Sequence, residues 1–318
     1  MTSLQTLTGQ MLCYISAHGR ACLMTGLLTG LLVPRLAALM VPWLPHMVAA
    51  LLAITALRIG HRAALGATRD LGWGLAAVGV LQLGVPLMLL ALMTAFGVAT
   101  TPAALAVLLA TAGPAISGST NLALLMGLDA GRMMQILVLG TAAFPVTVLP
   151  VLWFAPQLAD PLGVVQSAAV VLVVILAATA TGFGARAALL PDPTPRQVQM
   201  LDGASMLAFS VMVVGLMAPL NGALRETPLG VAGWTALAFV VSYGLQGLTL
   251  LVLRRGPMKP VAGPLAIGAG SRNIALFLVA LPADTIAPVL IFVACWQLPM
   301  YLTPMLLPRL YSWALTGD

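Results

Sequence analysis

Gly118-Ser119-Thr120-Asn121-Leu122-Ala123-Leu124 and Gly270-Ser271-Arg272-Asn273-Ile274-Ala275-Leu276 are two copies of one pattern, Gly-Ser-Xaa-Asn-Xaa-Ala-Leu, about half a chain length apart. Each copy is followed by a Pro-Xaa4-Pro pair, which extends the match: Pro145 and Pro150 in the first half, Pro299 and Pro304 in the second. The chain therefore contains an internal repeat. Both copies interrupt strongly apolar stretches, and paired interruptions of this kind are typical of the binding sites of secondary transporters.

The composition indicates an all-α integral membrane protein. Hydrophobic residues make up 61% of the 318 residues and charged residues only 7%, whereas soluble domains carry roughly 25% charged residues. The apolar runs are long enough to cross a hydrocarbon core of roughly 30 Å. They are continuous and lack the apolar-polar alternation of barrel strands, so helices are predicted. The lipid bilayer is thus an expected partner.

The formal net charge of +6 indicates membrane topology rather than a nucleic-acid partner, because the basic residues lie between apolar runs. Cys13, Cys22 and Cys295 have neither metal-ligand nor disulfide spacing, which predicts small packing residues and no metal cofactor. The N-terminal stretch lacks the pattern of a cleaved signal peptide, and none is expected.

Apolar runs bounded by charge, Pro or Gly predict ten transmembrane helices, at 13–33, 41–59, 71–93, 103–128, 133–154, 164–190, 203–220, 229–253, 261–281 and 285–307. They divide into five spans in residues 1–160 and five in residues 161–318. Because five is odd, the second half should enter the membrane from the opposite side. The two copies of the pattern are therefore predicted to form an inverted repeat.

The basic residues predict the orientation, since short cytoplasmic loops are enriched in Lys and Arg. Arg35 and Arg225 fall on one side of the membrane, and Arg272 falls at membrane depth. All the others fall on the opposite side: Arg20, Arg58, Arg62, Arg69, Arg132, Arg186, Arg196, Arg254, Arg255, Lys259 and Arg309. Both termini are therefore expected in the cytoplasm, with the chain in the cell inner membrane.

The fourth and ninth spans are predicted to be broken, at 113–121 and 268–273. The first of these segments contains Gly113-Pro114, and the second contains Gly268 and Gly270; Gly and Pro cost roughly 1 and 3 kcal/mol in a helix interior. Unwound backbone at membrane depth must be buried in protein or line a cavity. The alternative is that Gly and Ser only allow close helix packing, but an Asn at the matched position of both copies favours a site.

Arg272 is the most informative single residue. An arginine at the centre of a span usually faces a water-filled path or a partner, although a snorkelling position at an interface is an alternative. Neither interrupted span contains Asp or Glu. The neutralising group is therefore either a set of helix C-terminal carbonyls or a ligand.

Two further kinds of residue stand out in the apolar runs. Gln82, in the third span, is either a helix-packing hydrogen bond or part of the site. Several of the six tryptophans lie near the ends of the runs and are expected to be interfacial anchors; the six are Trp43, Trp73, Trp153, Trp234, Trp296 and Trp313.

At these segments, 118–150 and 268–304 above all, the chain resembles the bile acid:sodium symporter family and its bacterial relatives. The resemblance covers most of the chain. It implies two inverted five-helix repeats, with a core domain of spans 3–5 and 8–10 in which the broken helices 4 and 9 cross. Spans 1, 2, 6 and 7 would form a panel domain that moves against the core. It also implies uptake of organic anions with sodium at sites around the crossing.

The chain departs from the family at the sodium sites. Sodium-coupled members have Glu where this chain has Gly268 and Gln where it has Arg272. Thr120 and Asn121 remain as a weak remnant of a sodium site. The oxygen ligands of the fifth span are replaced around Met133, Met134, Leu137 and Val138. Sodium prefers several oxygen ligands and is repelled by a guanidinium, so these departures predict transport without sodium.

The expected function is secondary active transport of a small organic anion by alternating access. The candidate substrate-binding residues are Ser119, Thr120, Asn121, Ser271, Arg272, Asn273 and Gln82. Two roles remain open for Arg272: it binds the substrate anion, or it replaces sodium as the tether between the crossing helices. The alternatives are an auxin-efflux-like exporter, a channel and a non-transporting membrane sensor. The interrupted spans contain no acid pair, zinc motif or Ser/His dyad, so an enzyme is not expected.

Overall fold

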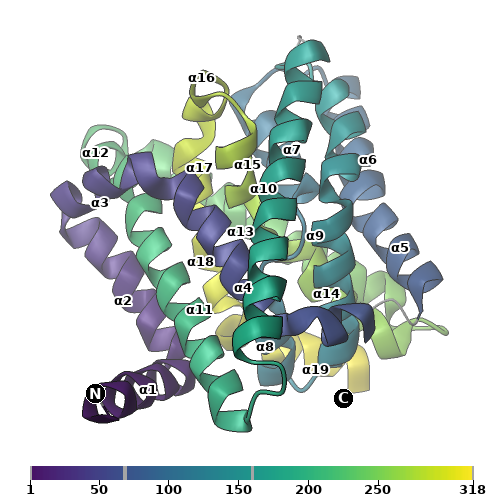
Figure 1. Cartoon of the computed structure of the whole chain (residues 1–318). Coiled ribbons are helices and arrows are strands. Elements are labelled where there is room, and N and C mark those ends of the chain that lie inside the picture. The colour runs from purple at the N-terminus through teal and green to yellow at the C-terminus, as the bar shows by residue number, and fades with distance from the viewer. Residues whose placement is uncertain (1, 67–69, 159–160, 317–318) are drawn as a thin grey trace. The chain divides into compact units, whose positions relative to one another are not determined.

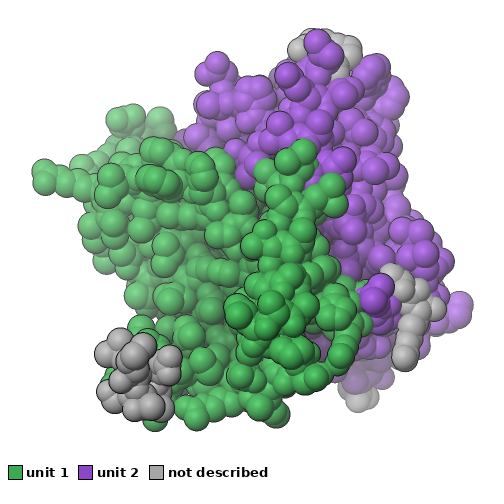
Figure 2. Space-filling view, viewed as in Figure 1, with its two compact units in different colours: residues 1–64, 173–228 green, residues 65–172, 229–318 purple. Residues whose placement is uncertain are grey.

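A computed structural model describes residues 2–66, 70–158 and 161–316. In these ranges the regular structure is helical apart from one isolated β-bridge (Figure 1). Arg69, and Asp160 at the expected end of the first repeat, lie outside the described residues. Contacts divide the chain into two units (Figure 2), Met1–Ala64 with Val173–Pro228, and Leu65–Leu172 with Leu229–Asp318.

The structure is that of a multi-pass membrane protein. Seven helical stretches of the described chain are long and apolar enough to cross a membrane: Pro34–Gly66, Leu71–Ala95, Ala130–Trp153, Leu162–Leu189, Pro195–Glu226, Pro228–Leu253 and Ala283–Leu306. These seven overlap seven of the ten predicted spans. The other three, at 13–33, 103–128 and 261–281, are not continuous long helices.

The prediction of one helix over 13–33 is wrong. The helix that begins near the N-terminus, α1 (Thr2–Ala17), ends before His18, whose φ and ψ of −112° and 30° are not helical. The next helix, α2 (Gly19–Leu32), has only 14 residues and is therefore roughly 21 Å long. It is shorter than a typical hydrocarbon core.

Unit 1 contains the segments expected for spans 1, 2 and 7 and part of span 6. Besides α1 and α2 it holds α3 (Pro34–Met40), η1 (Val41–Trp43), most of α4 (Leu44–Gly66), the end of α10 (Pro161–Leu189), α11 (Pro195–Leu216) and α12 (Ala218–Glu226). Helices α2 and α11 pack closely: a Cβ at Gly26 would overlap the Ser210 backbone. The Ser210 hydroxyl donates to the Cys22 carbonyl at 2.7 Å.

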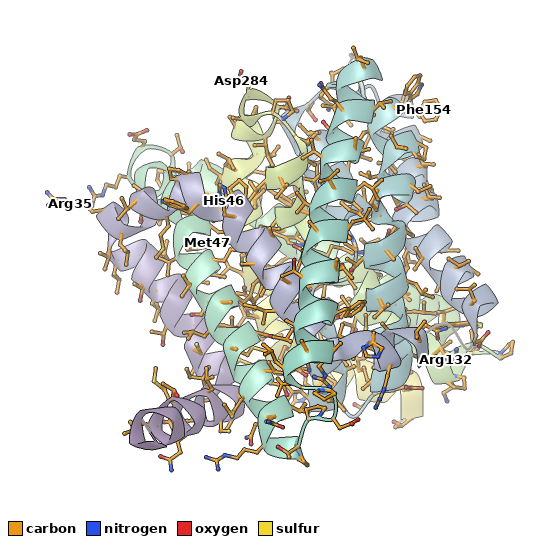
Figure 3. All side chains as sticks on the ribbon, viewed as in Figure 1. Arg35, His46, Met47, Arg132, Phe154 and Asp284 are labelled. Carbon is orange, nitrogen blue, oxygen red and sulfur yellow. The ribbon has the colours of Figure 1, made fainter. Side chains whose placement is uncertain are left out.

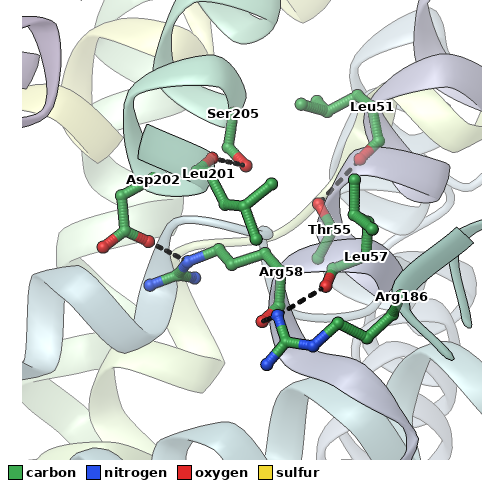
Figure 4. A network of polar contacts seen from close by, with 8 residues as sticks. All are labelled: Leu51, Thr55, Leu57, Arg58, Arg186, Leu201, Asp202 and Ser205. Atoms are coloured by element: carbon green, nitrogen blue, oxygen red, sulfur yellow. Dashed lines mark hydrogen bonds and ion pairs between the residues drawn. The ribbon is translucent and has the colours of Figure 1, made fainter. Parts of the chain in front are cut away.

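Helix α4 is kinked at Gly60, whose φ of 74° lies in the left-handed region and favours glycine. Arg186 of α10 donates to the Leu57 carbonyl at 3.2 Å, so it satisfies a carbonyl that the kink would otherwise leave free. Arg58 pairs with Asp202 of α11 (Figure 4). Basic side chains thus stabilise this end of unit 1 internally.

Unit 2 holds the two interrupted helices. Its first part comprises α5 (Leu71–Gly79), the π-helical turn η2 (Val80–Gly84), α6 (Val85–Ala95), α7 (Pro102–Ala112), α8 (Ser119–Leu125), α9 (Ala130–Trp153) and the start of α10. Its second part comprises α13 (Pro228–Leu253), α14 (Lys259–Gly270), η3 (Ile274–Leu276), α15 (Phe277–Ala280), α16 (Ala283–Ile286), η4 (Ala287–Val289), α17 (Leu290–Cys295), α18 (Gln297–Leu306) and α19 (Pro308–Thr316).

Charged side chains lie at both ends of unit 2. Figure 3 shows Arg132 at one end and Asp284 and Phe154 at the other. Arg132 pairs with Asp70 at 2.8 Å and lies over the Trp73 ring, 4.4 Å from its centroid. A charged pair beside a half-buried tryptophan is the pattern of a membrane-water interface.

Candidate functional site

Both copies of the repeated pattern lie at helix breaks, as predicted. Helix α7 ends at Ala112, and α8 begins at Ser119, the second residue of the first copy. Helix α14 ends at Gly270, and residues 271–273 are unwound before η3. The second break is shorter than predicted, because the backbone at Gly268 stays helical.

The two unwound segments pair with each other. The backbone N–H of Ile116 donates to the Ser271 carbonyl at 3.0 Å, and that of Asn273 donates to the Pro114 carbonyl at 2.8 Å. The pairing is antiparallel. These bonds satisfy backbone groups that the helix breaks leave free, and lipid could not supply partners for them. The interruptions therefore form one structure, here called the crossing (residues 113–121 and 268–273).

Arg272 lies at the crossing with 1% of its surface exposed. Its guanidinium donates from Nη1 to the Gly113 carbonyl at 3.1 Å, from Nη2 to the Leu81 carbonyl at 2.9 Å and from Nε to the Ala269 carbonyl at 3.2 Å. The first and last of these carbonyls are near the C-terminal ends of α7 and α14, where helices leave carbonyls without an intrahelical partner. The guanidinium thus links three chain segments through their backbone.

These bonds explain how the charge can be buried. Arginine at the centre of a transmembrane helix costs roughly 2.5–3.5 kcal/mol on insertion scales. A hydrogen bond to a charged group contributes about 1.5–3 kcal/mol, so three are sufficient to offset that cost. The negative ends of two helix dipoles add to the stabilisation. The interfacial position considered for Arg272 is therefore wrong, and helix-end carbonyls, not a carboxylate, surround its charge.

The crossing keeps a formal positive charge. Arg272 is the only charged residue among the buried residues that the structure describes. Carbonyl dipoles solvate a guanidinium but do not cancel its charge. A guanidinium has five N–H donors, and the three bonds above use three of them.

Three buried hydroxyl groups at the crossing lack a hydrogen-bond partner among the described residues, those of Ser119, Thr120 and Ser271. Their residues are 0%, 5% and 0% exposed. Each unsatisfied buried hydroxyl costs about 1–3 kcal/mol, and such groups in a native structure call for an explanation such as a bound molecule. Both copies of the repeat contribute, so the crossing has a polar surface that a ligand could satisfy.

The two matched asparagines also lie at the crossing. Asn121 is half-buried in α8, and Asn273 is 9% exposed and adjacent to Arg272. The backbone of Asn273 holds one of the two bonds between the unwound segments. Its carbonyl oxygen would lie 3.0 Å from a Cβ at Gly113, a tight contact, so glycine favours the close approach there.

Gln82 is positioned differently from the other predicted site residues. It lies in η2, is 1% exposed, and its Oε1 accepts from the Thr147 hydroxyl at 2.8 Å. Its Nε2 would lie 2.5 Å from a Cβ at Gly140, so the side chain packs closely against α9. Of the two roles open to Gln82, the geometry favours a helix-packing hydrogen bond. The π-helical turn itself, a feature often found at functional sites, presents the Leu81 carbonyl to Arg272.

The residues present do not fit the sodium ion that the resemblance implies. Three carbonyls that could bind a cation are bound by Arg272. Gly268 supplies no carboxylate, and a Cβ there would lie 3.3 Å from the Ile136 side chain. Met133 and Leu137 are buried on α9 and carry no oxygen in their side chains. A cation at the crossing would meet a buried positive charge and no buried carboxylate among the described residues.

Sequence reasoning missed Ser242 and Gln246 on α13, both 0% exposed. The Ser242 hydroxyl donates to the Gly270 carbonyl at 2.7 Å. Residues four apart lie on one helix face, and two polar side chains at that spacing in an apolar run were an available signal. Trp296 was missed too: it is 0% exposed, and its Nε1 donates to the Arg272 carbonyl at 3.0 Å.

No protein-family model matches the chain, and no curated protein matches it either. What can be said of the crossing therefore comes from its own geometry. It combines two paired unwound segments, a buried positive charge held by carbonyls, and buried hydroxyls without partners.

Proposed function

We propose that this protein is a secondary active transporter of a small organic anion, that it works by alternating access, and that it does not require sodium. The observation that carries the proposal is the crossing of two broken helices in unit 2, where three buried hydroxyls have no partner among the described residues. Broken helices that bring backbone ends and polar side chains to mid-membrane depth are typical of secondary transporters. The proposal assigns no enzymatic activity to the chain.

The charge at the crossing supports an anionic substrate. A buried guanidinium without a carboxylate leaves the surrounding region positive, and in a low-dielectric interior this favours anions over cations. In the proposed site the hydroxyls of Ser119, Thr120 and Ser271 and the amides of Asn121 and Asn273 donate hydrogen bonds to the anion. Arg272 contributes mainly through its charge, because much of its donor capacity is used by the backbone.

Arg272 also supports the proposal that transport does not require sodium. In the proposed mechanism the Arg272 guanidinium does permanently what a bound cation would do reversibly, which is to hold the ends of α7 and α14 together. The site is then assembled before substrate binds. No ion is needed to complete it.

A two-step experiment tests this function. Purified full-length protein is screened by thermal unfolding against carboxylates, sulfonates and neutral amides of matched size, each in sodium and in choline buffer. A ligand at one hundred times its Kd should stabilise the protein by about 2.7 kcal/mol. We expect anions to stabilise it equally in both buffers, and the hits to show saturable uptake into proteoliposomes. Stabilisation by the neutral amides alone, or flux that does not saturate, would reject the carrier.

The orientation is proposed with it: both termini in the cytoplasm, in the inner membrane of the cell. Helix α13 has 26 residues, roughly 39 Å, and separates Arg225 from Arg254. In a background without the native cysteines, Arg225→Cys and Arg254→Cys should react with an impermeant thiol reagent from opposite faces. Reaction of both from the same face would refute this topology.

A further inference from the structure

A chain of buried hydrogen bonds leads from the C-terminal helix α19 to the crossing, within unit 2. The Tyr311 hydroxyl donates to Gln246 Oε1 at 2.7 Å, and Gln246 Nε2 donates to the Ser242 hydroxyl at 3.3 Å. That hydroxyl donates to the Gly270 carbonyl at 2.7 Å. Tyr311 is 3% exposed, and the two α13 residues are 0% exposed.

The hydrogen bonds of this network are all donated in one direction, from Tyr311 toward backbone carbonyls. Gln246 Nε2 also donates to the Thr303 hydroxyl at 3.4 Å, which donates to the Pro299 carbonyl at 2.8 Å. The Ser242 and Thr303 hydroxyls each accept one hydrogen bond from Gln246 and donate one to a backbone carbonyl. If the Gln246 amide were turned over, both hydroxyls would donate to its oxygen, and the two carbonyls would lose these donors.

Tyr311 favours one of the two amide orientations. Burial raises the pKa of the Tyr311 phenol well above its usual value, so the group keeps its proton and remains a donor. A donor at this place favours the amide oxygen facing α19. The amide nitrogen then faces Ser242.

The chain of hydrogen bonds ends at Gly270, the last residue of α14. Gly270 packs so closely on α13 that a Cβ would overlap the Ser242 carbonyl oxygen and the Gln246 side chain. Its carbonyl is one of the helix-end carbonyls that need a donor from outside the helix. The unwound residues of the second copy follow it directly.

We infer that Tyr311 is a positioning residue for the crossing. Its hydroxyl orients Gln246, and through Ser242 it holds the end of α14. The unwound segment 271–273 is thereby kept in register with the first copy of the repeat. The inference rests on the proposed function only in treating the crossing as a binding site, since none of these side chains is assigned a contact with the substrate.

Hydrogen–deuterium exchange of the purified full chain tests this without any substrate. Tyr311→Phe removes only the hydroxyl. We expect amide exchange in residues 271–273 and at Ile116 to become about two- to tenfold faster, the effect of losing one hydrogen bond. Ser242→Ala should give the same localised change. The double variant should exchange no faster than Ser242→Ala alone, because the chain is already interrupted.

Tyr243→Phe is the matched control. Tyr243 lies on α13, the helix of Ser242 and Gln246. Its hydroxyl donates to the Pro299 carbonyl at 3.2 Å, and in the variant this carbonyl still accepts from the Thr303 hydroxyl. It should leave exchange at the crossing unchanged. Unchanged exchange at the crossing in Tyr311→Phe, or an increase spread evenly over the chain, would overturn the inference. If the faster exchange is confined to the crossing but the protein transports no anion, the positioning role of Tyr311 is supported and the proposed function is rejected.

Discussion

The two copies of the repeated pattern have the same sequence frame and opposite properties. The third position of the second copy is Arg272, whose guanidinium is bonded to three backbone carbonyls. The third position of the first copy is Thr120, whose buried hydroxyl has no partner among the described residues. At the third position, therefore, one copy holds the crossing together and the other presents an unsatisfied hydroxyl.

The glycines that open the two copies differ in the same way. A Cβ at Gly270 would overlap the Ser242 carbonyl oxygen, whereas a Cβ at Gly118 would meet no atom within 4 Å. The second copy is therefore packed and tethered, and the first has room. Matched positions of an internal repeat can thus differ in packing and in bonding while the copies keep a common sequence pattern.

The largest effect on stability is expected from substitutions at the third position of the repeated pattern, Arg272 and Thr120. Arg272→Met would leave the carbonyls of Gly113, Leu81 and Ala269 buried without these donors, at about 1–3 kcal/mol each. We expect a loss of at least about 3 kcal/mol in the free energy of unfolding, measured by thermal unfolding of the purified protein. Thr120→Val removes only a hydroxyl without a partner and should be neutral or stabilise by about 1 kcal/mol. Equal destabilisation by the two variants would remove the contrast between the copies.

The glycine pair should show the next largest contrast. Gly270→Ala overpacks the contact with α13, and overpacking typically costs about 1–3 kcal/mol. Gly118 has φ of −80° and ψ of −3°, which alanine adopts, so Gly118→Ala should change stability by less than about 1 kcal/mol. Melting temperatures of both variants under one set of conditions measure this. A Gly270→Ala protein as stable as Gly118→Ala would show that α13 does not hold the end of α14.

The break positions could be predicted from sequence, because Gly113-Pro114 disfavours a continuous helix and the interruption recurs in the matched copy at Gly270. The recurrence is what distinguishes them, since Gly263-Pro264 stays helical within α14. The partners of Arg272 could not be predicted, since a backbone carbonyl carries no side-chain signal. Only the fold brings the π-helical turn at Leu81 to the end of α14. The break at His18 has no proline to mark it, and the first span was misplaced for that reason.

The sequence predicts which residues lie at the site better than it predicts what each residue does there. The residues around the matched asparagines do lie at the crossing, whereas Gln82 packs against Thr147. Ser242 and Gln246 were missed because polar residues of α13 lie far from the repeat in sequence.

The smallest effect on stability, and a direct effect on binding, is expected from the matched asparagines. Asn121→Ala and Asn273→Ala should each weaken binding of an anion from the ligand screen by roughly tenfold, as for one lost hydrogen bond. Titration by thermal shift or calorimetry measures it. Normal binding by both variants would indicate that the repeated pattern serves helix packing alone.

The central claim is that Arg272 takes the place of a coupling cation. Arg272→Ala removes the guanidinium and opens the three carbonyls to a free cation, so the most direct measurement is thermal unfolding of this variant and of the unaltered protein. It is made in millimolar guanidinium, in sodium and in choline at equal ionic strength. We predict that guanidinium restores part of the stability that the variant has lost, by binding only the folded state, and that the unaltered protein is equally stable in sodium and in choline. A marked stabilisation of the unaltered protein by sodium would contradict the account.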